Sequence, residues 1–149
     1  MIVSIRHGTD QDLPTVVAFL RELYSELGEE AESLAWLSEE LVADLRRKGT
    51  LIFVAELEGR VAGLATLTRT QAIYAGGEYG VIDEMYVAPE ARSLGVGAKL
   101  VEACVDEAKV QGWKRLDVTA PTEERWVRTV FFYEAQGFRF TGPKLKREI

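Results

Sequence analysis

The chain has 149 residues, of which 47% are hydrophobic and 28% charged, as is ordinary for one globular domain over residues 1–149. A formal net charge of −6 argues against nucleic acid as a partner, because phosphate binding needs clustered Lys and Arg. We expect a cytoplasmic protein that acts without a membrane, since no apolar run approaches a membrane span and the N-terminus lacks a signal-peptide pattern. Cys104 and His7 are single, so we expect neither an internal disulfide nor a metal site.

The first half of the chain predicts a strand, two helices and a hairpin. Ile2–Arg6 alternates like an edge strand, and Thr9 offers a helix N-cap. Apolar residues then recur at helical spacing until Gly28. A second predicted helix carries apolar residues at the same spacing: Leu34, Leu37, Leu41 and Leu45. Thr50–Glu56 and Arg60–Thr68 flank a Gly-containing turn and predict a hairpin.

A strand–helix–strand unit follows in the second half. Gly80–Val87 predicts a strand that Pro89 ends, because proline cannot donate to a ladder. Gly95–Gln111 has one apolar and one charged face and predicts a helix, and Lys114–Thr119 predicts the next strand. Two strands joined in this way are parallel neighbours, so the sheet is predicted to be mixed.

The last segments complete the predicted fold. Glu123–Gln136 predicts a helix, and Phe138–Phe140 with Lys144–Glu148 predicts a closing pair of short strands. We therefore expect an α/β (α+β) fold with a mixed, mostly antiparallel central sheet of six to seven strands. About four helices should flank this sheet.

The connection between the predicted strand and helix has the features of an anion site. Residues 87–98 pass from a strand end into a helix N-terminus through Gly95 and Gly97. The free amides and the dipole of such a helix favour phosphate, glycine permits close approach, and Arg92 adds positive charge. A pyrophosphate is the natural ligand. The plain alternative is a turn in which glycine serves packing alone, because an isolated G-x-G is weak evidence.

Two other nucleotide motifs fit these glycines less well. No Gly-Lys-Ser/Thr follows at the spacing of a Walker loop. A dinucleotide fold has support from Asp117, which lies at about the distance of the acidic ribose ligand. However, the seven residues Ala88–Leu94 separate the strand from Gly95, and Leu100 replaces the third glycine. A dinucleotide-binding oxidoreductase therefore remains the weaker alternative.

The loop sequence Arg92-Ser93-Leu94-Gly95-Val96-Gly97 resembles the Q/R-x-x-G-x-G/A pyrophosphate loop of the GNAT superfamily of acyl-CoA-dependent N-acyltransferases. The segment from Phe132 to Phe138, FYEAQGF, resembles a second motif of that family, and the order of the elements matches over nearly the whole chain. The resemblance implies transfer of an acetyl group from acetyl-CoA to a primary amine of a small molecule, peptide or protein. The implied route is direct attack in a ternary complex, and a homodimer stays open.

The resemblance also assigns the cosubstrate contacts. The implied pyrophosphate loop comprises Arg92, Ser93, Leu94, Gly95, Val96, Gly97 and Ala98. The implied pantetheine contacts come from the backbone of the preceding strand at Met85, Tyr86 and Val87. One departure is Trp126, which stands where relatives often carry an asparagine that contacts the cosubstrate. This departure permits a second hypothesis, a non-catalytic acyl-CoA sensor.

The transfer itself needs a base for the attacking amine and an acid for the departing thiolate. Asp83 and Glu84 precede the loop, and strand alternation predicts that only one of them faces the site, with a slight preference for Glu84. Both are equally consistent with a solvated strand end or a clamp for a substrate ammonium group. Tyr133 would ordinarily be a packing residue, but it occupies the position of the general acid in the family motif.

Overall fold

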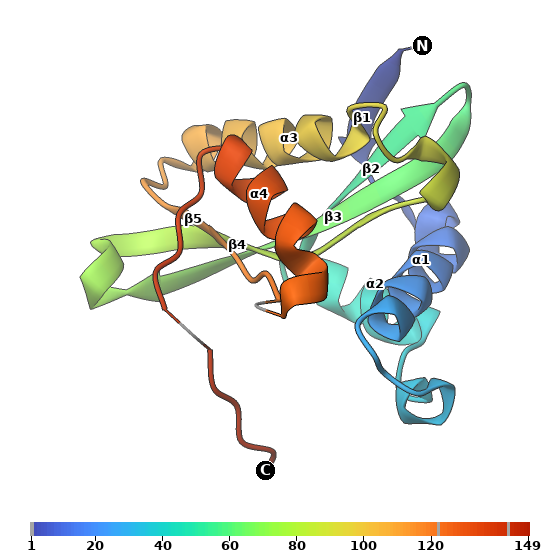
Figure 1. Ribbon diagram of the computed structural model, residues 1–149, viewed down its shortest axis with the longest axis horizontal. Coiled ribbons are helices and arrows are strands. Elements are labelled where there is room, and N and C mark those ends of the chain that lie inside the picture. The colour runs from blue at the N-terminus through green and yellow to red at the C-terminus, as the bar shows by residue number, and fades with distance from the viewer. Residues whose placement is uncertain (1, 122, 143) are drawn as a thin grey trace. The chain divides into compact units, whose positions relative to one another are not determined.

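A five-stranded sheet organises the larger part of the protein in the computed structural model, which describes residues 2–121, 123–142 and 144–149 (Figure 1). The chain divides into two units, Met1–Val118 and Thr119–Ile149. The first unit contains the strands β1 Val3–His7, β2 Leu51–Leu57, β3 Arg60–Ala72, β4 Gly77–Val87 and β5 Leu116–Val118. It also contains the helices α1 Leu13–Glu26, α2 Glu39–Arg47 and α3 Val96–Gln111. The second unit contains α4, Val127–Ala135.

The strands lie in the order β1-β2-β3-β4-β5. The first four pair antiparallel, and β5 pairs parallel to β4 after the chain crosses through α3. This arrangement confirms the predicted α/β fold class, the mixed sheet and the parallel strand–helix–strand unit.

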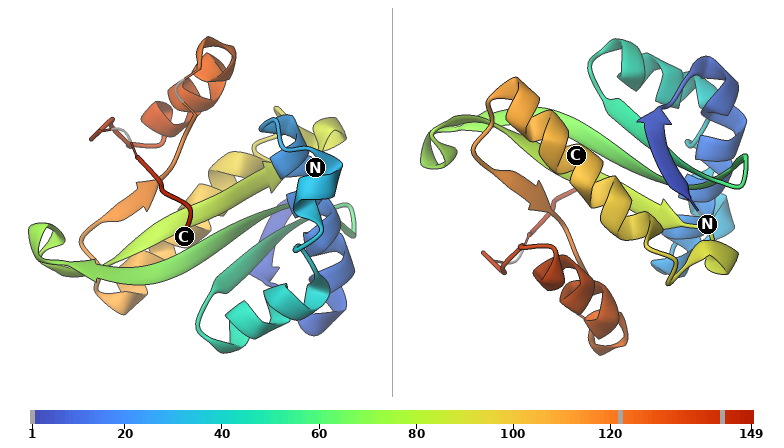
Figure 2. Two further views of the ribbon diagram at one scale, coloured as in Figure 1. Left: turned by 90° about the horizontal axis from the view of Figure 1, so that it is seen from below. Right: turned by 90° about the horizontal axis from the view of Figure 1, so that it is seen from above.

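Helices cover both faces of this sheet (Figure 2). On one face, the apolar side of α1 packs with α2 on the central strands, where Leu20, Val54 and Leu64 belong to one buried cluster. On the other face, α3 lies so close to β3 that a methyl group added to Gly63 would be 3.2 Å from Val96 and 3.4 Å from Leu100. The absence of a side chain at Gly63 therefore sets how closely the first turns of α3 approach the sheet.

The entry to α1 follows the predicted cap at Thr9. The backbone N–H of Thr9 donates to the Asp12 carboxylate over 2.7 Å, and α1 follows a short 3-10 turn, Asp10–Asp12. Arg6 from β1 donates two hydrogen bonds to the same carboxylate, at 2.7 and 2.9 Å. These bonds lower the pKa of Asp12 to about 2, so the carboxylate stays ionised and ties the first strand to the first helix.

The predicted closing strands and the second predicted helix were wrong. The sheet has five strands among the described residues, not six to seven, because Phe138–Phe140 and Lys144–Glu148 form no strand there. Phe140 is 72% exposed and Leu145 is 91% exposed, so these short segments bury no apolar face of the kind that stabilises a strand. The second predicted helix is instead a 3-10 turn, Ala31–Leu34, followed by α2, because the Ser38 hydroxyl accepts from the Leu41 N–H and starts a new helix.

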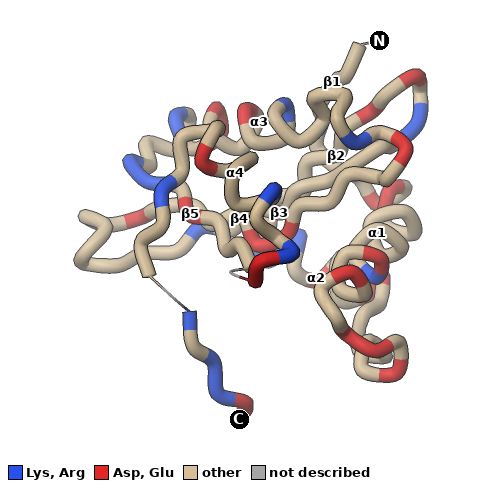
Figure 3. The backbone as a smooth tube through the Cα atoms, viewed as in Figure 1, with Lys and Arg blue, Asp and Glu red and all other residues tan. Residues whose placement is uncertain are grey.

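The exposed segment after α1 is acidic, as Figure 3 shows in red. Its charged members are Glu29, Glu30 and Glu32. All three are exposed, whereas Leu34 at the end of the 3-10 turn is buried and anchors the segment. The described geometry is that of a solvated surface.

We predict that Gly63→Ala destabilises the protein by about 1–3 kcal/mol, because the new methyl group would lie 2.8 Å from the backbone carbonyl oxygen of Tyr86. Gly8→Ala is the matched control, since its methyl group would meet the Ile52 side chain at 3.2 Å and the Ile52 carbonyl oxygen only at an ordinary contact distance of 3.5 Å. Urea unfolding of both variants measures the difference. Equal stability of the two variants would show that β3 and β4 accommodate the added methyl group at no cost.

Candidate functional site

A β-bulge interrupts strand β4 at Asp83. Thr66 pairs with Glu84 and the next residue, Leu67, pairs with Ile82, so Asp83 is an extra residue with no partner opposite it. A bulge of this kind breaks the alternation of side chains and redirects those on either side of it.

The bulge places both carboxylates on the same face of the sheet. Thr66 and Thr68 are two residues apart on β3 and therefore share a face. The Thr68 hydroxyl donates to Asp83 over 2.6 Å, and the Thr66 hydroxyl donates to Glu84 over 2.5 Å. The expectation that only one carboxylate faces this side is therefore wrong, because alternation fails at the extra residue.

Glu84 has the more enclosed surroundings of the two acids. Its Oε1 accepts from Thr66 and its Oε2 accepts from the Tyr24 hydroxyl of α1 over 3.0 Å, whereas Asp83 is exposed. Burial raises the pKa of Glu84 above its usual value, and the two donated hydrogen bonds oppose part of this rise. A carboxylate with a raised pKa takes up a proton more readily, as a general base must.

Tyr24 was not predicted as a functional residue. Its position on the apolar face of the first helix was clear from the sequence, and its ring lies 5.8 Å from that of Trp36. Which strand the end of α1 would face depends on tertiary packing, so no local signal connected Tyr24 with Glu84.

Next to the bulge, one edge of β4 has no neighbouring strand within residues 2–118. The parallel pairing with β5 spans Gly80–Ile82 on β4 and ends at Val118. Within residues 2–118, residues 84–87 pair only with β3, which lies on the side of β4 opposite to β5. Their outward backbone N–H and C=O groups can therefore pair with an extended ligand, as an added strand would. Met85, Tyr86 and Val87, predicted for the pantetheine contacts, lie on this stretch.

The predicted pyrophosphate loop leads into the N-terminus of α3. Its backbone takes left-handed conformations at Ser93, with φ of 68°, and at Gly95, with φ of 84°. The Lys99 N–H donates to the Gly95 carbonyl over 3.2 Å, so the amides of Val96, Gly97 and Ala98 precede that helical bond. These amides and the dipole of a helix of 16 residues are features that favour an anion at such a helix end.

Arg92 is held by groups of the protein itself. Its Nε donates to the Val87 carbonyl over 2.9 Å, and its NH2 group donates to Glu26 at the end of α1 over 2.8 Å. The guanidinium also lies 5.5 Å from the ring centroid of Tyr86. Arg92 therefore connects the loop with both β4 and α1.

Tyr133 lies in α4, within residues 119–149. It is buried between two aromatic neighbours, with ring centroids 5.2 Å from Phe132 and 5.7 Å from Phe138. The turn after the helix closes on it, because the Phe138 N–H donates to the Tyr133 carbonyl over 3.1 Å. At the start of this unit's helical segment, the buried indole N–H of Trp126 has no acceptor among the described residues.

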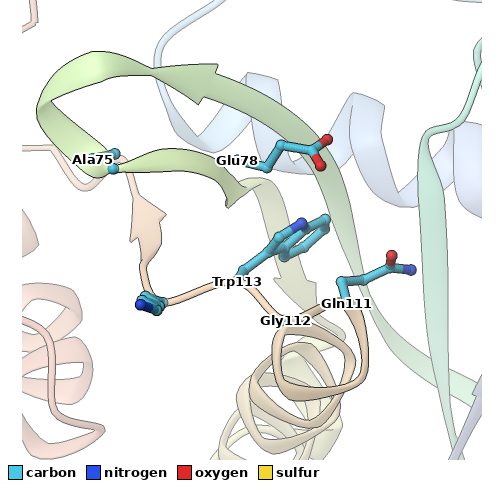
Figure 4. A pocket seen from close by; sticks show the side chains of 7 residues that line it. Ala75, Glu78, Gln111, Gly112 and Trp113 are labelled. Atoms are coloured by element: carbon cyan, nitrogen blue, oxygen red, sulfur yellow. The ribbon is translucent and has the colours of Figure 1, made fainter.

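Two surface hollows in the first unit lie away from the predicted residues. The smaller, of about 190 Å³, is formed by the end of the β3–β4 hairpin and the turn after α3, with Trp113 in its wall (Figure 4). The larger, of about 430 Å³, lies between β1 and α3. No predicted site residue lines either hollow.

The described residues contain no group of three or more His, Cys, Asp or Glu side chains arranged to hold a metal ion. None of the helices in the described ranges has the length and apolar character needed to cross a bilayer.

Known structures with this fold are numerous. A Bacillus halodurans protein described as a transcriptional regulator superposes with a TM-score of 0.80 at 25% identity, over 99% of this chain and 100% of that one. Glucosamine-6-phosphate N-acetyltransferase from Arabidopsis thaliana superposes with a TM-score of 0.75 over 99% of both chains, and at 20% identity it shows the fold alone.

Sequence comparison identifies the family. An IAA acetyltransferase of Azospirillum brasilense is 32% identical over 132 residues, covering 86% of this chain and 79% of that protein. An uncharacterized N-acetyltransferase of Bacillus subtilis is 26% identical, covering 91% of this chain and 89% of its own length. The model of the acetyltransferase (GNAT) family matches residues 17–138. The chain therefore belongs to the acetyltransferase (GNAT) family.

Proposed function

We propose that this protein transfers an acetyl group from acetyl-CoA to a primary amine of a small molecule, peptide or protein. The observation that carries the proposal is the arrangement at the end of β4. A partly buried carboxylate, a free strand edge and a helix N-terminus follow one another within residues 84–98. These are the parts that an amine, a pantetheine arm and a pyrophosphate would need.

The cosubstrate would lie along the free edge of β4. Pantetheine contains amide groups, so it can pair with the outward backbone groups of Met85 and with the N–H of Val87, whose carbonyl accepts from Arg92. Its pyrophosphate would then reach the amides of Val96, Gly97 and Ala98 at the start of α3. Backbone groups supply most of these contacts, which is why few special side chains are required.

The proposed reaction is a direct acyl transfer. The neutral amine nitrogen attacks the thioester carbonyl carbon and forms the new C–N bond. Glu84, as the base, takes the proton that the nitrogen loses. The C–S bond breaks, and Tyr133 is assigned the proton donation that converts the departing thiolate of CoA to the thiol. No covalent acyl-enzyme is involved; Cys104 is fully buried, and burial raises the pKa of its thiol to about 12.

The alternative is an acyl-CoA sensor without turnover, which Trp126 in place of asparagine permits. The direct experiment incubates the purified protein with acetyl-CoA and pools of primary amines and peptides, and follows release of the CoA thiol. Amine-dependent release supports the enzyme. Binding of acetyl-CoA without release from any pool would support the sensor. A homodimer and a cytoplasmic location remain predictions.

Gly97→Asp tests the anion site. An acidic side chain in the first turn of a helix favours the helix itself but repels a bound pyrophosphate. We expect acetyl-CoA to bind at least roughly tenfold more weakly, because one like-charge contact near a partly buried site costs about 1.4 kcal/mol or more. Gly97→Asn has nearly the same shape without the charge and should bind several-fold more tightly than Gly97→Asp. Equal affinities of the two variants in calorimetric titration would place the pyrophosphate elsewhere.

Glu84→Gln and Asp83→Asn test the choice of base. Glutamine keeps the shape of Glu84 but cannot take up the proton, so we expect kcat/KM to fall roughly 10²–10⁴-fold. Asp83→Asn should lower it less than tenfold, because that side chain is exposed. Steady-state thiol release measures both. A larger loss in Asp83→Asn would reverse the assignment.

Tyr133→Phe tests the acid. Loss of the hydroxyl should lower kcat roughly 10²-fold or more and leave the affinity for acetyl-CoA nearly unchanged, because only proton donation in the transition state is lost. Circular dichroism checks that α4 stays folded. Unchanged kcat would remove Tyr133 from the mechanism.

A further inference from the structure

The Glu84 carboxylate receives one hydrogen bond on each oxygen, from two different elements. Thr66 of β3 donates to Oε1 over 2.5 Å, and Tyr24 of α1 donates to Oε2 over 3.0 Å. Donors on both oxygens restrict rotation of the carboxylate. Each oxygen also keeps a second lone-pair direction, so the group can still accept a proton while held.

Thr66 holds the backbone of Glu84 as well as its side chain. The same hydroxyl oxygen accepts the Glu84 backbone N–H over 3.0 Å. This N–H belongs to the residue directly after the bulge, where regular strand alternation fails. A single hydroxyl therefore fixes the main chain and the carboxylate at the point where the strand is irregular.

Both the ring and the hydroxyl of Tyr24 have partners. Its ring contacts Trp36 and its hydroxyl contacts Glu84. Burial and the nearby Glu84 charge raise the pKa of Tyr24 above its usual value. The hydroxyl therefore remains a donor throughout the range in which a carboxylate titrates.

We propose that Tyr24 and Thr66 are positioning residues that hold the Glu84 carboxylate ionised and oriented to take the proton of the acceptor amine. The proposal rests on the proposed function of Glu84. The groups that face Glu84 are Tyr24 from α1, neutral Thr66 from β3 and the Asp83 carboxylate from β4 itself. The two hydroxyls favour the charged carboxylate, while burial and the Asp83 charge oppose it.

The test follows the titration of Glu84 directly, without an acceptor. The carboxyl carbons of glutamate are labelled with ¹³C, and the Glu84 signal is assigned by its absence in Glu84→Gln. Tyr24→Phe and Thr66→Val each remove a donor to the ionised form, so each should raise the Glu84 midpoint by about one pH unit. Thr66→Ser keeps the hydroxyl and should titrate as the wild type does. Tyr74→Phe is a matched control, because its hydroxyl contacts Tyr79 instead.

Once an amine substrate is found by thiol release, the acidic limb of the kcat/KM profile should move to higher pH in Tyr24→Phe and Thr66→Val, in step with the carboxyl titration. Unshifted titrations in both variants, with only a lowered melting temperature, would overturn the proposal and leave these residues as packing. If Thr66→Val does not fold, Thr66→Ser keeps the test valid. A shifted Glu84 midpoint in Thr66→Ser would contradict the proposal, because that variant keeps the hydroxyl. Full activity of Glu84→Gln would instead contradict the proposed base, and the titrations would still report on positioning.

Discussion

The bulge at Asp83 is the constraint on which the candidate site depends. In a regular strand, the carboxylates of Asp83 and Glu84 would lie on opposite faces of the sheet. The extra residue brings both carboxylates to the face covered by α1. There the Thr66 hydroxyl donates to Glu84 and the Thr68 hydroxyl donates to Asp83. Within residues 2–118, the same short stretch of β4 then has an unpaired edge, because the pairing with β5 has ended at Ile82. The carboxylates and the backbone groups proposed to pair with the ligand therefore lie in consecutive residues.

The last turn of α1 links the carboxylate with the loop. Tyr24 donates to Glu84, and Glu26 accepts from Arg92. Arg92 in turn binds the Val87 carbonyl and lies over the Tyr86 ring. The helix therefore contacts the proposed base and the proposed anion loop at the same time. Asp12 anchors the start of this helix, and its apolar face packs on the sheet. Both contacts are therefore held in a fixed relation within residues 2–118.

The features that depend on local sequence were predictable. Thr9 marked the start of the first helix, the glycines marked the entry to α3, and two motifs in the correct order identified the family. The bulge was not predictable, because Asp83 and Glu84 form an ordinary run within a strand pattern and the extra residue is defined only by pairing with β3. Tyr24 was missed for a related reason, since its partner is 60 residues away along the chain. The closing strands were predicted from short local patterns, but Phe140 and Leu145 bury no face that would stabilise them.

The central claim is that the edge of β4 and the N-terminus of α3 bind acetyl-CoA. Calorimetric titration of the purified protein with acetyl-CoA, with NAD titrated in parallel, tests it most directly. We expect saturable binding of acetyl-CoA at one site for each chain and no comparable binding of NAD. Failure to bind acetyl-CoA, or a preference for NAD, would contradict it.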